Sequence, residues 1–294
     1  MPVGDSIETW RVAAFSDNVH HLTQQKEAKL EPYVRKATGL KGKVKFFDIL
    51  SATEMQRNTV RHGDTTWNDM DMTRRAAFKI NYAWAHPIDE EDQLENLADV
   101  TSEVAIAAAR AVHRRIDRTI IDALYGAAAY DEAGASSLAL PSAQKETTAS
   151  GNTLAKLIAS LRKFHDADVD VNPNDVVYVH SPASLEDLLL VSSPGLVFTS
   201  KDFNPAMALV TGQINSYLGM RWIMSTLLPI VSSTNVRGTY LFHRDAIGFA
   251  EWVRSKGGVS VRHDKNDTVQ VLVKSMFGAV RVEDKLVVEN QVTE

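Results

Sequence analysis

The chain has 294 residues, of which 44% are hydrophobic and 23% charged, with a formal net charge of −5. This balance is typical of a folded globular protein, since a disordered chain would need fewer apolar residues and a stronger net charge. The negative charge argues against a chain-wide basic surface for nucleic acid. Because there is no cysteine, disulfides, thiolate metal sites and a cysteine nucleophile are excluded. We expect no signal peptide, and no membrane span because no run of about 18 apolar residues occurs.

Residues 1–42 are polar with scattered apolar side chains, and they predict an extended N-terminal arm. Phe15, Val19 and Leu22 are spaced as on one face of a short helix. Pro32 then interrupts the pattern. We expect an arm that carries a helical piece; the alternative is a first helix packed on its own core.

Residues 43–88 predict a long two-stranded ribbon. One strand begins at Val44–Phe46, and the other is marked by alternating aromatic and polar residues over 78–84. The polar tip between them carries the acidic residues Asp64, Asp69 and Asp71. An isolated two-stranded ribbon is marginally stable in water, so we expect it to lie on its own body or on a neighbouring subunit.

The strongest predicted element is a helix near residues 97–128. Apolar side chains recur there at steps of three or four residues, from Leu97 to Leu124. About 30 residues at 1.5 Å each give a rod of roughly 45 Å, longer than the usual helix of a compact domain. We therefore expect this helix to be a spine of the molecule.

A basic stripe follows this helix, because Arg110, Arg114 and Arg118 repeat every four residues. The stripe lies on the face roughly opposite the apolar side chains. One interpretation is an ordinary solvated face with local pairs to acidic residues such as Asp117 and Asp122. The other is a docking rail for the acidic ribbon tip of a neighbouring copy.

The rest of the chain predicts helices followed by strands. A small, polar stretch over 131–151 is a loop or a boundary. Helices are expected around Leu154–Leu161 and Pro182–Val191, with a short apolar strand Asp175–His180 between them. Later strands are predicted at Met220–Ser225, Thr239–Phe242, Ile247–Trp252, Val259–Arg262, Thr268–Val273 and Ala279–Val282. Helices in the middle with strands around them favour the α+β class.

No motif for catalysis or metal binding is complete. Residues 166–172 alternate aspartate with other residues as in a calcium loop, but Val171 and Val177 stand where glycine and glutamate are needed. His243–Asp245 resembles a kinase triplet, but no glycine-rich phosphate loop accompanies it. The sequence therefore gives no catalytic, cofactor-binding or metal-binding residue. This does not exclude an enzyme, because catalytic groups often converge from distant segments.

The order of these elements resembles the tailed-phage major capsid proteins of the Hong-Kong-97-type fold. The similarity is carried by Trp67–Arg75, Leu154–Leu161 followed by Val176–Pro182, Leu218–Pro229, Asp245–Ala250 and Met276–Glu283. Each stretch alone is a weak signal. Their order and spacing over nearly the whole chain make the match fairly specific.

The resemblance implies an α+β capsid fold with five parts. These are an N-terminal arm at 1–42, an E-loop hairpin at 43–88, a P-domain with the spine helix at 89–147, an A-domain at 148–255 and a return to the P-domain at 256–294. In that family the E-loop lies over an adjacent subunit. This would bring the aspartates of the ribbon tip to the arginines of the spine helix in the next copy.

The resemblance also implies a structural shell subunit of the virion, with no enzymatic activity and no cofactor. Hexamers and pentamers of the chain would form an icosahedral shell around double-stranded DNA, without sequence-specific DNA binding and without a membrane. Assembly is expected in the bacterial host cytoplasm. A separate scaffolding protein and a portal are implied partners, and a decoration protein is a further candidate. The lysine–asparagine crosslinking pair of the family's founding member cannot be assigned in this sequence.

Three alternatives stay open at this point. An encapsulin-like compartment shares the fold and encloses enzymes, and neighbouring genes would distinguish it from a phage shell. A soluble α+β enzyme predicts a monomer or small oligomer with a defined pocket. A nucleic-acid binder is disfavoured by the net charge of −5.

Overall fold

The structure is a computed structural model, and it describes residues 25–57, 61, 63–64, 67–88, 100–131, 133–147, 150–190, 216–231, 235–265 and 268–294. The strands in these ranges form three sheets. Helices and strands both contribute, as expected for the α+β class. The short helix predicted over residues 15–22 of the arm lies outside the described residues.

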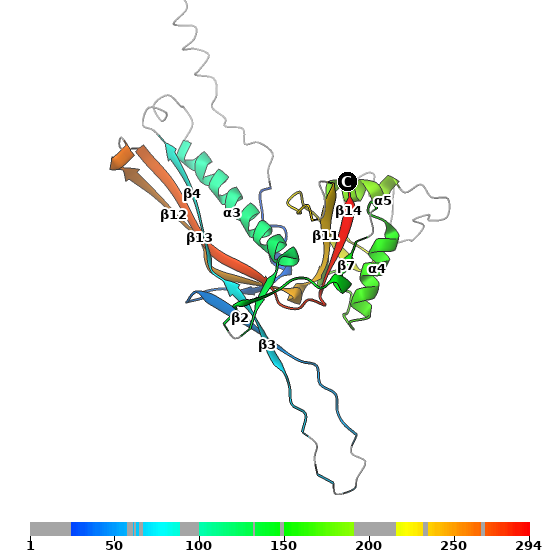
Figure 1. Ribbon diagram of the computed structural model, residues 1–294. Helices are drawn as coiled ribbons and strands as arrows, with labels where there is room; N and C mark the ends of the chain where they lie inside the picture. The colour runs from blue at the N-terminus through cyan, green and yellow to red at the C-terminus, as the bar shows by residue number, and fades with distance from the viewer. Residues whose placement is uncertain are drawn as a thin grey trace, which may run out of the picture.

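The first sheet has four strands in the order β1-β12-β13-β4. Their bounds are Arg35–Ala37 for β1, Ile247–Arg262 for β12, Thr268–Arg281 for β13 and Ile80–Ile88 for β4. β12 and β13 form a long antiparallel pair, β4 is antiparallel to β13, and the short β1 runs parallel to β12. The predicted spine helix is confirmed as α3, Val100–Tyr125, which lies along this sheet in Figure 1.

The second sheet has six strands in the order β7-β14-β11-β8-β10-β9. Their bounds are Lys145–Glu146 for β7, Val287–Thr293 for β14, Val236–His243 for β11, Val176–His180 for β8, Met220–Met224 for β10 and Ser216–Tyr217 for β9. All five residues of β8 are buried, as expected for a central strand with both faces covered. The helices α4, Leu154–His165, and α5, Pro182–Leu190, lie beside this sheet (Figure 1).

The third sheet has the order β2-β3-β5-β6 and forms the base of the predicted ribbon. β2 covers Val44–Leu50, β3 Met72–Phe78, β5 Ala128–Tyr130 and β6 Ser136–Leu138. β2 and β3 pair antiparallel over their full length, from Val44 opposite Phe78 to Leu50 opposite Met72. Figure 1 shows this ribbon extending out of the body in the direction opposite to α3.

The largest hydrophobic core joins the arm, α3 and both large sheets. It contains Leu30 from the arm, Ile116 and Ile120 from α3, Phe242 from β11 and Phe277 from β13, all at most 1% exposed. The segment after residue 24 is thus part of the folded body. A second core lies between α4, α5 and the six-stranded sheet, and a third at the base of the ribbon.

The prediction that residues 78–84 form the return strand of the ribbon was wrong in its partner strand. Phe78 does pair with β2, opposite Val44, but from Ile80 onward the partner is β13, with Tyr82 opposite Ser275 and Trp84 opposite Val273. The strand that pairs with β2 is β3, whose sequence is too rich in charge and alanine to stand out. The chain passes from one sheet to the other at Lys79, so the period of two continues although the partner strand changes.

Two further strand predictions are corrected by the pairing. Ile247–Trp252 and Val259–Arg262 are parts of one strand, β12, and Thr268–Val273 and Ala279–Val282 fall on or beside one strand, β13. Lysine, serine and glycine in the intervening segments are weak strand formers. Pairing between the two long strands, with bulges between Glu251 and Lys256, maintains the strand conformation there.

The division of the chain into capsid domains stays a prediction. The sheet to which each strand belongs differs in two places from the expected residue ranges. All of β12 lies in the first sheet, including the part that falls within the expected A-domain range 148–255. The strand β14 was not predicted, and it lies in the six-stranded sheet with β11. The last part of the range 256–294 therefore pairs with the sheet that contains β8 and β10.

Candidate assembly surfaces

The acidic tip of the ribbon is exposed in the single chain. Asp64, Asp69 and Asp71 are all exposed at or near the end of the β2–β3 pair. The backbone of Asp71 is held by Ser51, whose N–H donates to the Asp71 carbonyl at 3.0 Å and whose Oγ accepts from the Asp71 N–H at 3.1 Å. Within the described residues, no ion pair involves these three carboxylates. The tip therefore presents acceptors that no described residue of its own chain neutralises with an ion pair.

Large apolar side chains surround these carboxylates, a feature that the sequence reasoning missed. The exposed fractions are 100% for Met55, 96% for Trp67, 70% for Met72, 58% for Leu50 and 53% for Met70. A group of exposed apolar side chains in a narrow ribbon is typical of a surface that another protein covers. A tryptophan within a polar turn was the available signal, since Trp rarely stays exposed without a partner.

The basic stripe faces away from the core, as predicted. Arg114 and Arg118 are exposed and Arg110 is half-buried, whereas Ile116 and Ile120 on the other face are fully buried. None of the described residues forms an ion pair with the three arginines of the stripe. This surface of α3 is consequently a row of positive charge that no described residue neutralises with an ion pair.

The local pair predicted between this stripe and Asp117 was wrong. Asp117 is 2% exposed and points to the arm, where it accepts hydrogen bonds from the backbone N–H groups of Lys29 at 2.9 Å and Leu30 at 3.0 Å. Burial raises the pKa of Asp117, and the hydrogen bonds from the arm only partly oppose this. Asp122, the other predicted partner, accepts from the Tyr125 hydroxyl at 3.3 Å.

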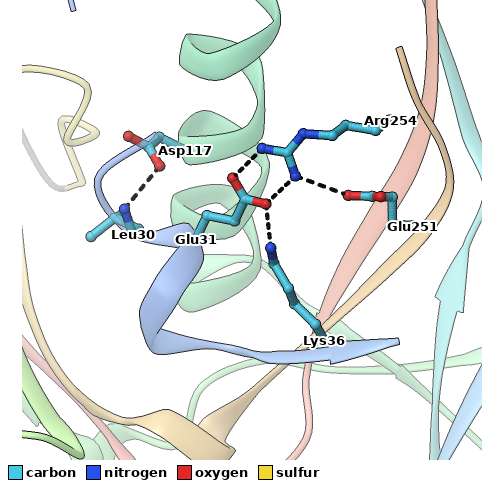
Figure 2. A network of polar contacts seen from close by, with 6 residues as sticks. All are labelled: Leu30, Glu31, Lys36, Asp117, Glu251 and Arg254. Carbon is cyan, nitrogen blue, oxygen red and sulfur yellow. Dashed lines mark hydrogen bonds and ion pairs between the residues drawn. The ribbon is translucent and has the colours of Figure 1, made fainter. Parts of the chain in front are cut away.

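A network of charged side chains fixes the arm beside α3 and β12, as Figure 2 shows. The Glu31 carboxylate is buried and accepts hydrogen bonds from Arg254 and Lys36, and Arg254 also pairs with Glu251 at 3.4 Å. Burial alone would raise the pKa of Glu31, but the hydrogen bonds and charges of Arg254 and Lys36 outweigh it, so the pKa is lowered. The arm is thus attached to the body by a carboxylate on each side, Glu31 from the arm and Asp117 from α3.

A fully buried arginine holds the C-terminal end of the spine helix. Arg281, in β13, donates to the carbonyls of Leu124 at 3.2 Å, Gly126 at 2.7 Å and Leu138 at 2.9 Å. Its Nε donates to the Asp284 carboxylate at 2.6 Å. The last carbonyls of a helix have no partner within the helix and carry partial negative charge, so a buried cation there is stabilising.

The calcium-like segment 166–172 and the triplet His243–Asp245 both lie in parts of the chain that the structure describes. Within the part of the chain that is described, no three His, Asp or Glu side chains are grouped so as to hold a metal ion. Residues 166–172 form the connection from α4 to β8, with Asp168 at φ 55°. None of the described helices is long and apolar enough to cross a membrane.

The structure does not bring the acidic tip and the basic stripe together within one chain. The ribbon projects out of the body while α3 lies along the first sheet on the opposite side (Figure 1). A contact between Asp69 or Asp71 and the stripe would therefore have to be made by two copies. The geometry of a long projecting ribbon with an uncovered tip suits a protein that joins neighbouring copies of itself.

Comparison with known proteins agrees with this geometry. Solved structures with the same fold include those of Mycobacterium phage Che8, with a TM-score of 0.71 and 18% identity over 94% of this chain and 95% of that chain. The capsid of cyanophage P-SCSP1u has a TM-score of 0.72 and 14% identity over 94% and 91%. The capsid asymmetric unit of cyanophage Pam1 has a TM-score of 0.70 and 12% identity over 95% of each chain.

At these identities the structural likeness shows the fold, which is the Hong-Kong-97-type fold of phage capsids. No curated protein matches the chain. The family model described as "Phage capsid protein" matches residues 7–294, nearly the whole sequence. The chain therefore belongs to the family of phage capsid proteins.

Proposed function

We propose that this chain is the major capsid protein of a tailed phage and that it builds an icosahedral shell from hexamers and pentamers. The observation that carries the proposal is the family match over residues 7–294. The projecting ribbon supports it, because its exposed apolar tip is covered by nothing in its own described chain. The protein acts by assembly, and no catalytic step is part of the proposal.

The parts of the fold suggest how copies would meet. The first sheet with α3 corresponds to the P-domain, the six-stranded sheet with α4 and α5 to the A-domain, and the β2–β3 ribbon to the E-loop. A-domains would surround the five-fold and six-fold axes. The ribbon tip, with Asp64, Asp69 and Asp71, would lie over an adjacent subunit near Arg110, Arg114 and Arg118.

Other partners follow from the same proposal. A scaffolding protein and a portal would take part in assembly in the host cytoplasm, and a decoration protein would bind the outer surface in some forms of the shell. Double-stranded DNA would be enclosed without sequence-specific contacts. The net charge of −5 supports this, since a shell of that charge repels DNA and does not bind it tightly.

The test is electron microscopy of the full chain, expressed alone and with its scaffolding protein, together with light scattering on the same samples. Closed shells, or rings of five and six copies, are the expected result. A protein that stays monomeric with its scaffolding partner would overturn the proposal. Shells that enclose an enzyme and exclude DNA would instead identify an encapsulin-like compartment.

A further inference from the structure

The methionines that the structure describes fall into two groups. The exposed ones all lie at or near the tip of the ribbon, and they are Met55, Met70 and Met72, with exposed fractions of 100%, 53% and 70%. The others lie in strands of the two large sheets, where Met220 is fully buried and Met224 and Met276 are half-buried. Exposed methionine side chains of the described residues are thus concentrated on one projecting element (Figure 1).

The pairing at the end of the ribbon holds two of these side chains on one face. Met72 begins β3 opposite Leu50, the last residue of β2, so their side chains lie on the same face. The pairing continues one residue further, because the Ser51 N–H donates to the Asp71 carbonyl at 3.0 Å. Met70 precedes Met72 by two residues, and alternate residues of an extended segment share a face. Leu50, Met70 and Met72 therefore make one face of the ribbon end apolar.

The thioether group of methionine is open to oxidation by a peroxide. The O–O bond of hydrogen peroxide breaks and an S–O bond forms, so that sulfur loses two electrons and the other oxygen leaves as water. The product is methionine sulfoxide, in which a polar group replaces an apolar one. The chain has no cysteine, so no thiol competes for the peroxide. Because the peroxide has to reach the sulfur atom, exposed methionines react before the buried Met220.

Oxidation at the ribbon tip changes a surface and not the core of the subunit. None of the three tip methionines belongs to a hydrophobic core of the described residues. A sulfoxide there stays solvated in the free subunit and costs the fold little. In the proposed shell the tip lies over an adjacent subunit, and a polar group that is covered without a hydrogen-bond partner weakens such a contact.

We propose that Met55, Met70 and Met72 are a site of oxidation by hydrogen peroxide in the unassembled subunit, and that their conversion to sulfoxides blocks assembly. This inference rests on the proposed shell function and adds a chemical control to it. A subunit that has entered a shell is protected, since the contact covers the tip. The block is reversible, because methionine sulfoxide reductases restore the thioether.

The test starts from unassembled subunits that are treated with hydrogen peroxide, after which catalase removes the peroxide. Peptide mapping by mass spectrometry locates each sulfoxide, circular dichroism checks the fold, and light scattering follows assembly with the scaffolding protein. One variant replaces the three tip methionines with leucine, which keeps their size and apolar character but removes the sulfur. The matched control keeps the tip and replaces the other internal methionines, with Met207→Leu, Met220→Leu, Met224→Leu and Met276→Leu.

We expect sulfoxides to form first at Met55, then at Met72 and then at Met70, in the order of exposure. Oxidation should leave the circular dichroism unchanged and raise the subunit concentration needed for assembly by about tenfold or more, because a covered polar group without a partner costs at least that factor. The tip variant should assemble equally well with and without peroxide. The matched control should be as sensitive as the unaltered chain, and treatment with both reductases should restore its assembly.

Subunits that carry the three sulfoxides and still assemble normally would refute the inference and leave the shell function standing. An equal loss of assembly in the tip variant would refute it too, because the sensitive group would then lie elsewhere. If the untreated chain forms neither shells nor rings with its scaffolding protein, the proposed function fails and this inference fails with it.

A second measurement needs no oxidant. Glutamine places a polar group where the sulfoxide would be, so Met70→Gln with Met72→Gln imitates the oxidised ribbon face. Met70→Leu with Met72→Leu is the control at the same positions. We expect the glutamine variant to need about ten times more subunit for assembly than the leucine variant, with the same melting temperature before assembly. Equal assembly of the two variants would show that the polarity of this face does not control the contact.

Discussion

The Glu31 carboxylate binds the Arg254 guanidinium with both oxygens, and the two residues are 223 positions apart in the sequence. The second of these hydrogen bonds, from Nη2 to Oε2, is 2.9 Å long. Bidentate pairs of this kind are the stronger class of charged hydrogen bond. The pair attaches the part of the arm around Glu31 to β12 (Figure 2).

Replacing Glu31 with Gln should lower the free energy of unfolding of the subunit. Glu31 is buried but the Arg254 side chain is 44% exposed, so we expect a loss of about 1–2 kcal/mol and not the larger cost of a fully buried pair. Urea unfolding of unassembled subunits measures the change. The control is Asp264→Asn, which removes a pair with Arg262 on the exposed end of β12 and should have no measurable effect. Equal losses in both variants would contradict the prediction.

Acidification should change the contributions of Glu31 and Asp117 to the stability of the subunit in opposite directions. The pKa of Glu31 is lowered, so its contribution to stability is present above its unfolded pKa of about 4.3 and is lost as the pH falls through the folded value. The pKa of Asp117 is raised, so its contribution is fully present below its unfolded pKa of about 3.9 and is lost as the pH rises through the folded value.

The measurement is the free energy of unfolding of each variant relative to the unaltered chain, followed from neutral pH toward pH 3. The penalty of Glu31→Gln should shrink on acidification, whereas the penalty of Asp117→Asn should grow. Penalties that change in the same direction would show that one of the two pKa shifts has the wrong sign.

Gly278→Ala should be among the most damaging small substitutions in the first sheet. A Cβ at this position would lie 2.1 Å from the backbone oxygen of Phe78, where the chain leaves the ribbon for β4. The backbone must move, so we expect a loss of about 2 kcal/mol or more in the free energy of unfolding. Gly258→Ala on the neighbouring strand meets open space and should be close to neutral. Similar melting temperatures for the two variants would disprove the close approach of Gly278 to the backbone oxygen of Phe78.

Arg281→Met should destabilise the subunit by about 3 kcal/mol, since it leaves the carbonyls of Leu124, Gly126 and Leu138 without their buried donor, while Asp284 keeps only its pair with Arg75 at 3.0 Å. Chemical denaturation of the unassembled subunit is the measurement. Arg162→Met serves as the control, because Arg162 is 80% exposed and its ion pair within the described residues is with an exposed Asp166. A loss for Arg281→Met no larger than that of the control would show that the helix end does not depend on Arg281.

Charge reversal tests the contact between the acidic tip and the basic stripe. Asp69→Lys with Asp71→Lys should impair assembly, and so should Arg114→Glu with Arg118→Glu, because each places like charges together. Combining the two sets restores opposite charges and should recover part of the assembly yield, as seen by light scattering. Each exposed pair contributes only about 0–1 kcal/mol, but the contact repeats around the shell. A combined variant that assembles no better than either set alone would refute the contact between the acidic tip and the basic stripe.

The sequence by itself determined the local elements with strong periodicity. The spine helix was predicted because apolar side chains such as Ile116 and Ile120 recur at helical spacing, and they are buried as that spacing requires. A strand over Asp175–His180 was predicted because a short apolar run between polar segments is typical of a buried strand, and it is confirmed with a start one residue later, at Val176. The order of these elements also pointed to the capsid fold, which the family match and the solved structures support.

Only the tertiary structure decided which strands pair and which charges meet. The alternating segment 78–84 fits either the ribbon or the first sheet, because a period of two fixes the faces of a strand and not its partner. Asp117 looked like a surface neighbour of the arginine stripe, yet it lies on the buried face of α3 and holds the arm. A cavity beside Arg115 is lined by three separate elements, α3, β4 and β13, so no local pattern could reveal it. Sequence periodicity sets which side of an element is buried, whereas long-range packing sets what it is buried against.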